Sequence, residues 1–372
     1  MKKKVCLNMI VKDESPVIQR CLASVKHLID YWVIVDTGSQ DGTQQIIRDY
    51  LKEIPGELHE RPWVDFAINR NVAMDLAKNR GDYLLIIDAD EFLVFDDDFQ
   101  MPELTLAAYF LQKLTDSEAF YRELLIDNRL GWRWQGALHE SLWLPQVNRA
   151  EILKGIANVA VADGHRSRDP KKFLKDAAIL ERMVSEDPNN GRHAFYLAIS
   201  YLNAKEHATA LKKFEKRVAM GGDGEEVFYS MMMIARLQEE LKMDPEVFID
   251  SYHQAYQFRP TRAEPLFYMA CYYGQIKADL LGYLLSKYAL SLPYPSDQRN
   301  VNVAIYEYEL LIKLAAFSYE LGYMDEACSA YEQLIEKFER YLKQPYRFPA
   351  LQKSIPDVLP GMKLFVCQNR RA

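Results

Sequence analysis

The sequence predicts two domains: an α/β domain with a Rossmann-like, mostly parallel sheet, followed by an all-α domain of helical repeats. Up to about residue 165, short apolar runs alternate with amphipathic segments, the pattern of parallel strands joined by helical crossovers. After about residue 170 glycine becomes rarer, and all five tryptophans lie at or before Trp143. A chain of 372 residues can bury a core in each domain. We expect the first domain at residues 1–168, the repeats at 169–344, and an irregular, proline-spaced tail at 345–372.

The first domain should contain at least three strands whose carboxyl ends meet at one edge of the sheet. Apolar runs predict strands at residues 5–11, 32–35 and 83–87, and apolar residues at helical spacing predict helices at 16–28, 43–51 and 67–77. In open parallel sheets the ligand binds beyond the carboxyl ends of the strands. Polar residues follow each predicted strand: Lys12-Asp13-Glu14, Asp36-Thr37-Gly38-Ser39 and Asp88-Ala89-Asp90.

The run after the third strand places three carboxylates, Asp88, Asp90 and Glu91, within four residues. Like charges this close repel one another and lose solvation, so they persist most easily where a divalent cation takes their oxygens as ligands. The sequence therefore predicts a metal site here, with Glu91 in a structural role. The alternative is a set of solvated acidic groups that cap the next helix.

The segment after the second strand combines a polar turn with the start of a helix. Asp36, at the strand tip, is placed to accept a hydrogen bond from a base or ribose, whereas Asp41 fits the role of a helix cap. Gly38 and Gly42 permit a tight turn, but the segment is neither a GxGxxG nor a Walker loop.

The second half repeats at the spacing of tetratricopeptide units, in which paired helices interlock through small and large residues. The alternative interpretation of this half is a helical bundle without repeats. Four units are predicted from these positions: Tyr196, Leu197, Ala198, Tyr201, Ala210 and Phe214; Ala235, Tyr252, Ala255 and Pro260; Ala270, Tyr273, Ala289 and Leu290; and Leu314, Gly322, Ala327 and Tyr331.

Composition excludes some partners and favours one compartment. A formal charge of −7 without a basic stripe argues against nucleic acid. Five scattered cysteines without a CxxC pair fit reduced thiols and a cytoplasmic protein. The run at residues 5–11 is interrupted by Asn8 and fits a strand better than a signal peptide, and no apolar run reaches the roughly 20 residues of a transmembrane segment.

Three segments in this order resemble family 2 glycosyltransferases of the GT-A fold: residues 7–14 (LNMIVKDE), 34–43 (IVDTGSQDGT) and 86–91 (IIDADE). The resemblance covers roughly residues 5–165. Within the family, the chain looks most like a subgroup that has tetratricopeptide repeats after the transferase domain. This subgroup includes bacterial enzymes that glycosylate peptides. The resemblance implies a metal-dependent, inverting hexosyltransferase that uses a nucleoside diphosphate sugar, commonly a UDP-sugar.

The resemblance also assigns roles to particular donor-site and metal-site residues. Asp36 would hydrogen-bond the nucleobase, and Val11 and Glu14 would line the nucleoside pocket. Asp88-Ala89-Asp90 matches the DxD motif, in which Asp90 would bind Mn²⁺ or Mg²⁺ and Asp88 would hold the ribose or a metal-bound water. His165 matches a late metal-binding histidine, although a lone histidine is as often a surface or helix-start residue.

Three arginines and a tryptophan are further candidates for the donor site. Arg70 could reach the diphosphate or a DxD carboxylate, and a surface ion pair is its alternative. Arg166, together with Arg168, could clamp the diphosphate. Trp63 could form a pocket wall, although core packing is commoner for tryptophan.

For catalysis we expect Glu140 to act as the general base, in a Gly-x-x-His-Glu pattern near the acceptor site. Its alternative is a salt bridge with a structural role, and Asp127 and Asp65 are rival bases. The acceptor would be a peptide, protein or glycan, and the repeats could hold a peptide or form a homodimer. One competing function is a degenerate transferase domain that serves as a binding scaffold. Another is a nucleotidyltransferase, which would want a glycine-rich basic loop where this chain has Lys12-Asp13-Glu14-Ser15-Pro16.

Overall fold

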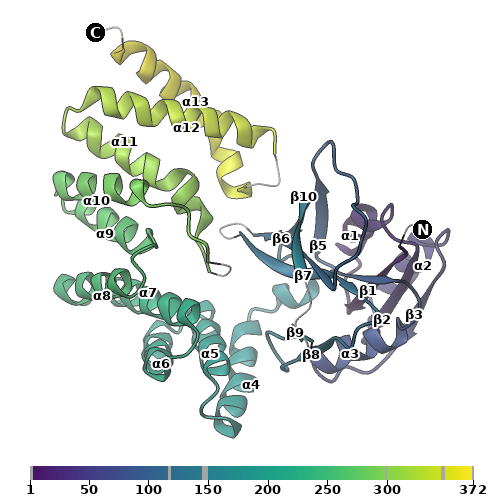
Figure 1. Ribbon diagram of the computed structural model, residues 1–372. Coiled ribbons are helices and arrows are strands. Elements are labelled where there is room, and N and C mark those ends of the chain that lie inside the picture. The colour runs from purple at the N-terminus through teal and green to yellow at the C-terminus, as the bar shows by residue number, and fades with distance from the viewer. Residues whose placement is uncertain (1–2, 116–118, 145–149, 298–299, 345–347, 371–372) are drawn as a thin grey trace. The chain divides into compact units, whose positions relative to one another are not determined.

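The computed structural model describes residues 3–115, 119–144, 150–297, 300–344 and 348–370 (Figure 1). Contacts divide the chain into two compact units, one formed by residues up to 115 and 120–179 and the other mainly by residues 180–372. The division falls within helix α4 (Lys172–Glu186), later than the boundary expected at residue 168.

An eight-stranded sheet forms the first unit, in the order β3-β2-β1-β4-β7-β6-β10-β5. β1 pairs in parallel with β2 and β4, and β2 in parallel with β3, whereas β7 runs antiparallel to β4 and β5 antiparallel to β10. The predicted mostly parallel α/β fold is therefore confirmed. The strands are β1 (Val5–Val11), β2 (Tyr31–Asp36), β3 (Gly56–Glu60), β4 (Tyr83–Ile86), β5 (Glu91–Phe95), β6 (Ala108–Leu114), β7 (Ala119–Asp127) and β10 (Ala150–Ala160), with a separate two-stranded sheet of β8 (Arg133–Gln135) and β9 (Ser141–Trp143).

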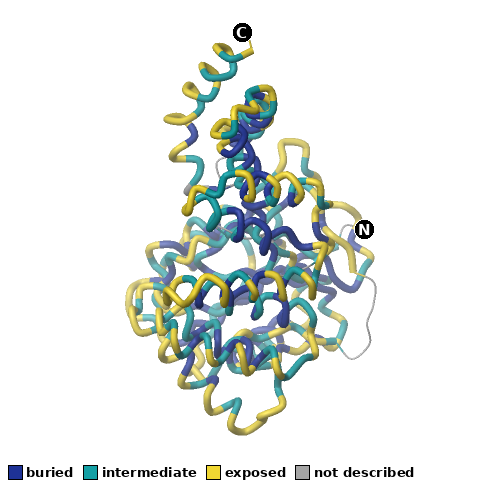
Figure 2. The backbone as a smooth tube through the Cα atoms, turned by 90° about the vertical axis from the view of Figure 1, so that its left-hand side faces the viewer, coloured by how far each residue is buried: buried dark blue, intermediate teal, exposed yellow. Residues whose placement is uncertain are grey.

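Helices cover both faces of this sheet, because alternate strand residues point to opposite sides. Leu7 and Met9 of β1 face a core shared with α1 (Ile18–Val25) and α2 (Thr43–Tyr50), whereas Cys6 faces a core shared with α3 (Phe66–Leu76). The central strands are buried almost throughout. Figure 2 colours the backbone of the whole chain by burial. This packing fixes the carboxyl ends of β1, β2 and β4 beside one another.

The second unit consists of antiparallel helix pairs that match the predicted repeats. Tyr252 and Phe214 are buried, as are the small residues that the repeat pattern marks at Ala198, Ala235 and Ala327. The predicted tetratricopeptide-like array is confirmed. Its pairs are α5 (Gly191–Asn203) with α6 (His207–Met220), α7 (Gly224–Glu240) with α8 (Pro245–Phe258), α9 (Glu264–Gln275) with α10 (Asp279–Ser291), and α11 (Leu310–Glu320) with α12 (Met324–Leu342).

The expectation of an irregular tail is wrong for residues 349–369, which form helix α13 (Pro349–Asn369) against α12. Each interior proline, Pro356 and Pro360, removes a backbone hydrogen bond and costs about 3 kcal/mol in an ordinary helix. An apolar face offsets this cost: Ile355 is fully buried, and Leu351 and Leu359 pack against the same core. Residues 345–347 lie outside the described part of the chain.

Candidate active site

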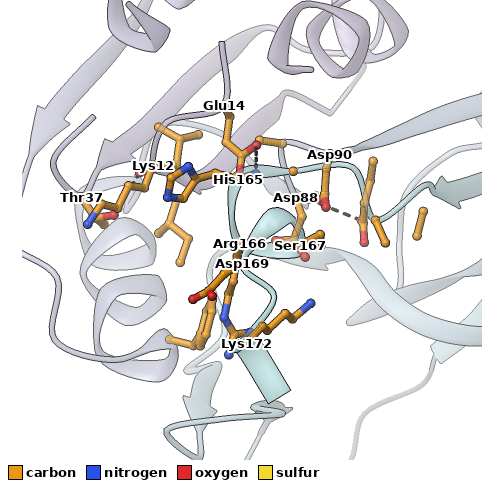
Figure 3. A pocket seen from close by; sticks show the side chains of 18 of the residues that line it. Lys12, Glu14, Thr37, Asp88, Asp90, His165, Arg166, Ser167, Asp169 and Lys172 are labelled. Carbon is orange, nitrogen blue, oxygen red and sulfur yellow. Dashed lines mark hydrogen bonds between the residues drawn. The ribbon is translucent and has the colours of Figure 1, made fainter. Parts of the chain in front are cut away.

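A cavity of about 610 Å³ opens at the carboxyl ends of β1 and β4 (Figure 3). Its walls come from the strand tips, from the start of α3, from the end of β10, and from the segment that leads into α4 through a short 3₁₀ helix, η1 (His165–Arg168). The charged and hydroxyl-bearing lining residues are Lys12, Glu14, Thr37, Arg70, Asp88, Asp90, Glu91, Lys113, His165, Arg166, Ser167, Asp169, Lys172 and Lys175.

Hydrogen bonds join the loop after β1 to the loop after β2 at the edge of the cavity. The Thr43 hydroxyl accepts a hydrogen bond from the Glu14 amide at 2.8 Å, and the Ser39 hydroxyl accepts one from the Asp13 amide at 2.8 Å. Asp41 accepts from the Thr43 amide at 3.0 Å at the start of α2 and from the Ser15 amide at 2.9 Å. The N-cap position of α2 is Gly42, so Asp41 is not the cap residue itself, but it holds the first helical residue and fixes the loop that carries Glu14.

Asp90 and Glu14 bring two carboxylates to one point at the centre of the cavity. A Cβ atom on Gly164 would lie 2.8 Å from Asp90 Oδ2 and 3.0 Å from Glu14 Oε2, so only glycine leaves room there. Burial and the charge of Asp90 raise the pKa of Glu14 to about 7, although a hydrogen bond from the His165 amide opposes them. Burial and the charges of Asp88 and Glu91 likewise raise the pKa of Asp90.

These two carboxylates suit a small divalent cation. Neither has a cationic partner within ion-pair distance in the described structure, and Mg²⁺-type sites commonly use only one or two carboxylates, with phosphate and water completing the shell. The described residues contain no group of three or more His, Cys, Asp or Glu arranged to hold a metal by themselves. The His165 imidazole is half exposed and lies 3.9 Å from Asp13 Oδ2, so its ring is directed toward Asp13.

Asp88 is held by a buried arginine. Arg70 Nη2 donates to Asp88 Oδ1 at 2.6 Å, and Arg70 Nε donates to Glu140 Oε1 at 2.7 Å. The guanidinium also stacks on Trp134, with its centre 5.1 Å from the ring centroid. Burial alone would raise the pKa of Asp88, but the charges of Arg70 and Lys113 hold it below its usual range.

Glu140 therefore does not line the cavity itself and is connected to it only through its ion pair with Arg70, which does. Its side chain is 9% exposed. The rivals are placed elsewhere: Asp127 pairs with Tyr83 at the opposite end of β4 and binds Arg129, whereas Asp65 caps α3 through the Ile68 amide at 2.7 Å. Among the three candidate bases, Glu140 has the most direct link to the cavity.

Asp36 does not line the cavity, although the sequence predicted it in the donor site, whereas its neighbour Thr37 does. Asp36 is fully buried, outside the cavity lining, and its Oδ1 accepts from the amides of Gly38 and Ser39 at 2.8 Å each. Its Oδ2 has no hydrogen-bond partner in the described structure. Thr37, the next residue, lines the cavity, and strand alternation was the signal that could have identified it.

The remaining predicted donor residues, Val11 and Arg166, both line the cavity, and so does Trp63. Arg166 forms an ion pair with Asp176 and stacks over Phe66, 4.8 Å from the ring centroid. Arg168 instead binds the Asp163 carbonyl at 3.1 Å, outside the lining. Glu91 is held by Lys113 and by Asn158, whose Nδ2 donates at 2.6 Å, in agreement with a structural role.

Four charged side chains that line the cavity have no ion-pair partner in the described structure. Besides Arg70 with Asp88, the paired groups are Lys113 with Glu91, Arg166 with Asp176, and Lys175 with Asp169. Without an ion-pair partner are the carboxylates Glu14 and Asp90 and the lysines Lys12 and Lys172. The sequence carried no signal for Lys172.

The first domain is a mostly parallel α/β domain with carboxylates at the strand tips, the place where such sheets bind ligands, and helical repeats follow it. Residues 6–104 match the model of glycosyl transferase family 2. The match covers the first part of the N-terminal domain, which therefore resembles family 2, and tetratricopeptide-like repeats follow that domain.

Similar proteins agree with both parts of this assignment. A TPR repeat-containing protein of Synechococcus elongatus is 34% identical over 146 residues, which are 37% of this chain and 35% of that protein. An uncharacterized glycosyltransferase of Rickettsia prowazekii is 34% identical over 91 residues, 24% of this chain and 29% of that protein. The chain thus matches about a third of the length of these relatives.

Solved structures superpose only loosely. MamA aligns with a TM-score of 0.38 at 14% identity over 48% of this chain and 95% of MamA. S. aureus TarS aligns with a TM-score of 0.32 at 14% identity over 68% of this chain and 55% of TarS. The assignment rests on the family match and on the helix pairs, because TM-scores this low do not establish a shared fold.

Within the described residues, no helix combines the length and apolar character needed to span a membrane.

Proposed function

We propose that this protein is a metal-dependent, inverting glycosyltransferase that moves a hexose from a nucleoside diphosphate sugar, in the first place a UDP-sugar, to an acceptor. The observation that supports this most is the pair of carboxylates without ion-pair partners, Asp90 and Glu14, at the strand tips of a family 2 domain. Their mutual repulsion and burial are relieved by a divalent cation, which in turn attracts a diphosphate.

The donor would lie across the strand tips. Val11, Thr37 and Lys12 form the end of the cavity suited to a nucleoside, with Asp36 shaping the turn beneath it. Asp90 and Glu14 would hold Mn²⁺ or Mg²⁺, with His165 at the edge of that site. When bound, the metal neutralises the charge that develops on the leaving diphosphate.

Asp88 and Arg70 would orient the donor at its ribose or sugar. Arg70 keeps Asp88 ionised, so that Asp88 can accept hydrogen bonds from hydroxyl groups. Arg166 would stand beside the diphosphate.

Transfer would be a single in-line displacement. An acceptor hydroxyl attacks the anomeric carbon, the bond from that carbon to the diphosphate oxygen breaks, and a base takes the hydroxyl proton. We propose Glu140 as this base. To act, its carboxylate must exchange the hydrogen bond from Arg70 Nε for the acceptor hydroxyl.

The repeats would bind a peptide, protein or glycan acceptor, or a second copy of the chain. A homodimer is supported by α10, whose exposed side includes Leu280, Leu284 and Tyr288 at successive turns. Lys287 on the same side is engaged by Glu326 at 3.0 Å, so a second copy of this neutral stripe would bury no unpaired charge. Sedimentation of wild type and Leu284→Glu tests this: a dimer that the variant does not form supports the proposal, and a monomeric wild type contradicts it.

The five cysteines are free thiols, three of them buried, which supports a cytoplasmic location. Fractionation of cells that produce the protein would test this location.

The deciding experiment is a hydrolysis screen of nucleotide sugars with and without Mn²⁺ or Mg²⁺. Transferases slowly cleave their donor without an acceptor, so one nucleotide sugar should be cleaved in a metal-dependent way. If the protein binds no nucleoside diphosphate in the presence of metal, the scaffold function replaces the enzymatic one.

A further inference from the structure

One side of the cavity forms a continuous aromatic and cationic wall, here called the α4 wall and defined as Trp63, Phe66, Arg166 and Lys172. Trp63 meets Phe66 edge-on, with ring centroids 4.8 Å apart, and the Arg166 guanidinium lies over the Phe66 ring. All four residues line the cavity. The wall therefore brings the segment before α3 together with the start of α4.

Lys172 is the member of this wall whose charge has no carboxylate partner in the described structure. Its ammonium lies 5.2 Å from the centroid of the neighbouring Phe173 ring. Burial and the nearby charge of Arg166 lower the pKa of Lys172, and the charges of Asp176 and Asp90 offset only part of this. A half-buried ammonium beside another cation is costly, and an anion bound in the cavity would remove that cost.

The other wall cation is engaged, and so is the next lysine of the helix. Arg166 is bound by Asp176, and Lys175 is bound by Asp169 at 2.5 Å. Lys175 lines the same cavity from the same helix and therefore serves as a matched comparison for Lys172.

The α4 wall lies apart from the end of the cavity assigned to the nucleoside. In Figure 3, Lys12 and Thr37 lie on one side of His165, and Lys172 lies beyond Arg166 on another. Glu14 and Asp90, where a metal would hold the diphosphate, lie on a third side, above His165 and Arg166 in the same view. Lys12 is near the nucleoside, the metal site serves the diphosphate, and Lys172 remains for a further anion.

The aromatic residues of the α4 wall suit the uncharged part of a molecule that carries such an anion. Trp63 is 44% exposed, although tryptophan is usually mostly buried, and its ring forms part of the cavity surface. Aromatic faces pack well against the C–H faces of sugar rings and other flat, partly apolar groups. An aromatic surface beside an unpaired ammonium suits a ring or chain that carries both hydroxyls and a negative charge.

We propose that the α4 wall binds the acceptor, and that the acceptor carries an anionic group, a carboxylate or a phosphate, which Lys172 binds. This inference rests on the proposed function, because it places the acceptor opposite the nucleoside end of the donor. Lys172 is a specificity residue here and takes no part in proton transfer.

The test measures binding to full-length protein by calorimetry, first of UDP with Mn²⁺ and then, at saturating UDP and Mn²⁺, of three probes. The probes are glucuronate, glucose 6-phosphate and, as the neutral reference, glucose. Wild type should bind at least one anionic probe about tenfold more tightly than glucose, the scale of one charge-assisted contact. Lys172→Met should lose that preference and Lys172→Arg should keep most of it. Lys175→Met should resemble wild type, and each variant should bind UDP within about twofold of wild type.

Every other outcome is informative. Equal affinity of wild type for the three probes overturns the inference. A weaker affinity of Lys172→Met for UDP would assign Lys172 to the donor diphosphate. A preference for UDP-glucuronate over UDP-glucose that depends on Lys172 would place the anion on the donor sugar. The weaker affinity for UDP and this preference would each overturn the inference. If wild type binds no UDP, the proposed function fails, whereas the probes can still be titrated without UDP. Comparison of the affinities for glucuronate and glucose 6-phosphate shows whether Lys172 prefers a carboxylate or a phosphate.

Discussion

At the residue scale, the site is governed by which charges are paired. Asp88 and Asp90 are two positions apart, yet Arg70 binds the first, whereas the second has no ion pair with any residue that the structure describes. The pKa of Asp88 is therefore lowered and that of Asp90 raised. The DxD motif thus presents one carboxylate fixed in its ionised form and one that a metal could bind.

Asp90→Asn should abolish sugar transfer without harming the fold. Asparagine is nearly isosteric but a much weaker metal ligand, so metal-dependent donor hydrolysis should fall at least about a hundredfold. The melting temperature of the metal-free variant should equal or exceed that of wild type, because a carboxylate repelled by Asp88 and Glu91 is removed. Steady-state rates and thermal melts measure both, and Asp98→Asn, at an exposed site outside the cavity, is the control. Unchanged turnover would remove Asp90 from the metal site.

Glu14→Gln should change the pH dependence of stability. In wild type the pKa of Glu14 is raised from about 4.3 in an unfolded chain to about 7 by burial and Asp90. The folded protein therefore loses stability as pH rises from roughly 4 to 7, and the loss is complete above that range. Because Glu14 is partly exposed, the effect should be on the order of 1 kcal/mol, or about 2–4 °C in melting temperature.

The variant should consequently melt above wild type at pH 8 in EDTA and close to it at pH 4.5. Scanning fluorimetry at the two pH values measures this. An equal difference at both pH values would contradict the assignment.

Glu140→Gln should separate chemistry from binding. Glutamine cannot accept the acceptor proton, so transfer should fall by about 10²–10⁴-fold, the usual contribution of a general base. Affinity for UDP with Mn²⁺ should stay within about twofold, because Glu140 does not line the cavity. If UDP binding and transfer fall together, Glu140 acts as a positioning residue through Arg70 and Asp88.

The sequence located the segments of the site more reliably than the role of each side chain. Glu14, Asp88 and Asp90 could be predicted because each lies in the short polar segment that follows β1 or β4. Asp36 and Thr37 could be distinguished only once the strand register was known, since neighbours on a strand point to opposite faces. The Arg70–Glu140 pair joins residues 70 positions apart in the chain, and no local pattern encodes it.

At the element scale, the three adjacent strands β1, β2 and β4 were predicted, whereas β3 at one edge of the sheet was not. β1, β2 and β4 read as apolar runs because both of their faces are covered. β3 at one edge has the sequence Gly-Glu-Leu-His-Glu and is half exposed, so it has no such run. In α13, two prolines obscured a helical apolar face that only the packing against α12 reveals.

The repeat helices depend on small residues at their contacts, which Gly282 of α10 illustrates. A Cβ atom there would lie 2.4 Å from Phe317 Cζ, and the Phe317 ring of α11 is buried. Gly282→Ala should therefore push α10 and α11 apart and lower the free energy of unfolding of the helical domain by about 1–3 kcal/mol. Gly361→Ala, in α13 with open space around it, should be neutral or slightly stabilising. Urea titrations followed by circular dichroism compare the two, and equal effects would contradict the packing argument.

At the scale of the whole molecule, the chain consists of two units with separate cores. The sequence predicted the change from sheet to helices near residue 168, whereas contacts divide the chain within α4. The reason is that α4 starts as a wall of the cavity, through Lys172 and Lys175, and continues into the helical array, where Glu181 binds Lys213 at 2.9 Å. A helix shared in this way has no boundary that composition could reveal.

A fragment of residues 1–186, which keeps α4 whole, should fold by itself. It contains the complete sheet, the helices on both of its faces and every residue that lines the cavity. We expect a cooperative thermal transition by circular dichroism and an affinity for UDP with Mn²⁺ within about threefold of the full chain, since the lining residues are unchanged. Acceptor transfer should fall far more than donor hydrolysis if the repeats bind the acceptor. Residues 187–372 provide the complementary sample and should give a helical spectrum without UDP binding. A fragment that folds but does not bind UDP, while the full chain does, would show that the donor site requires the repeat domain.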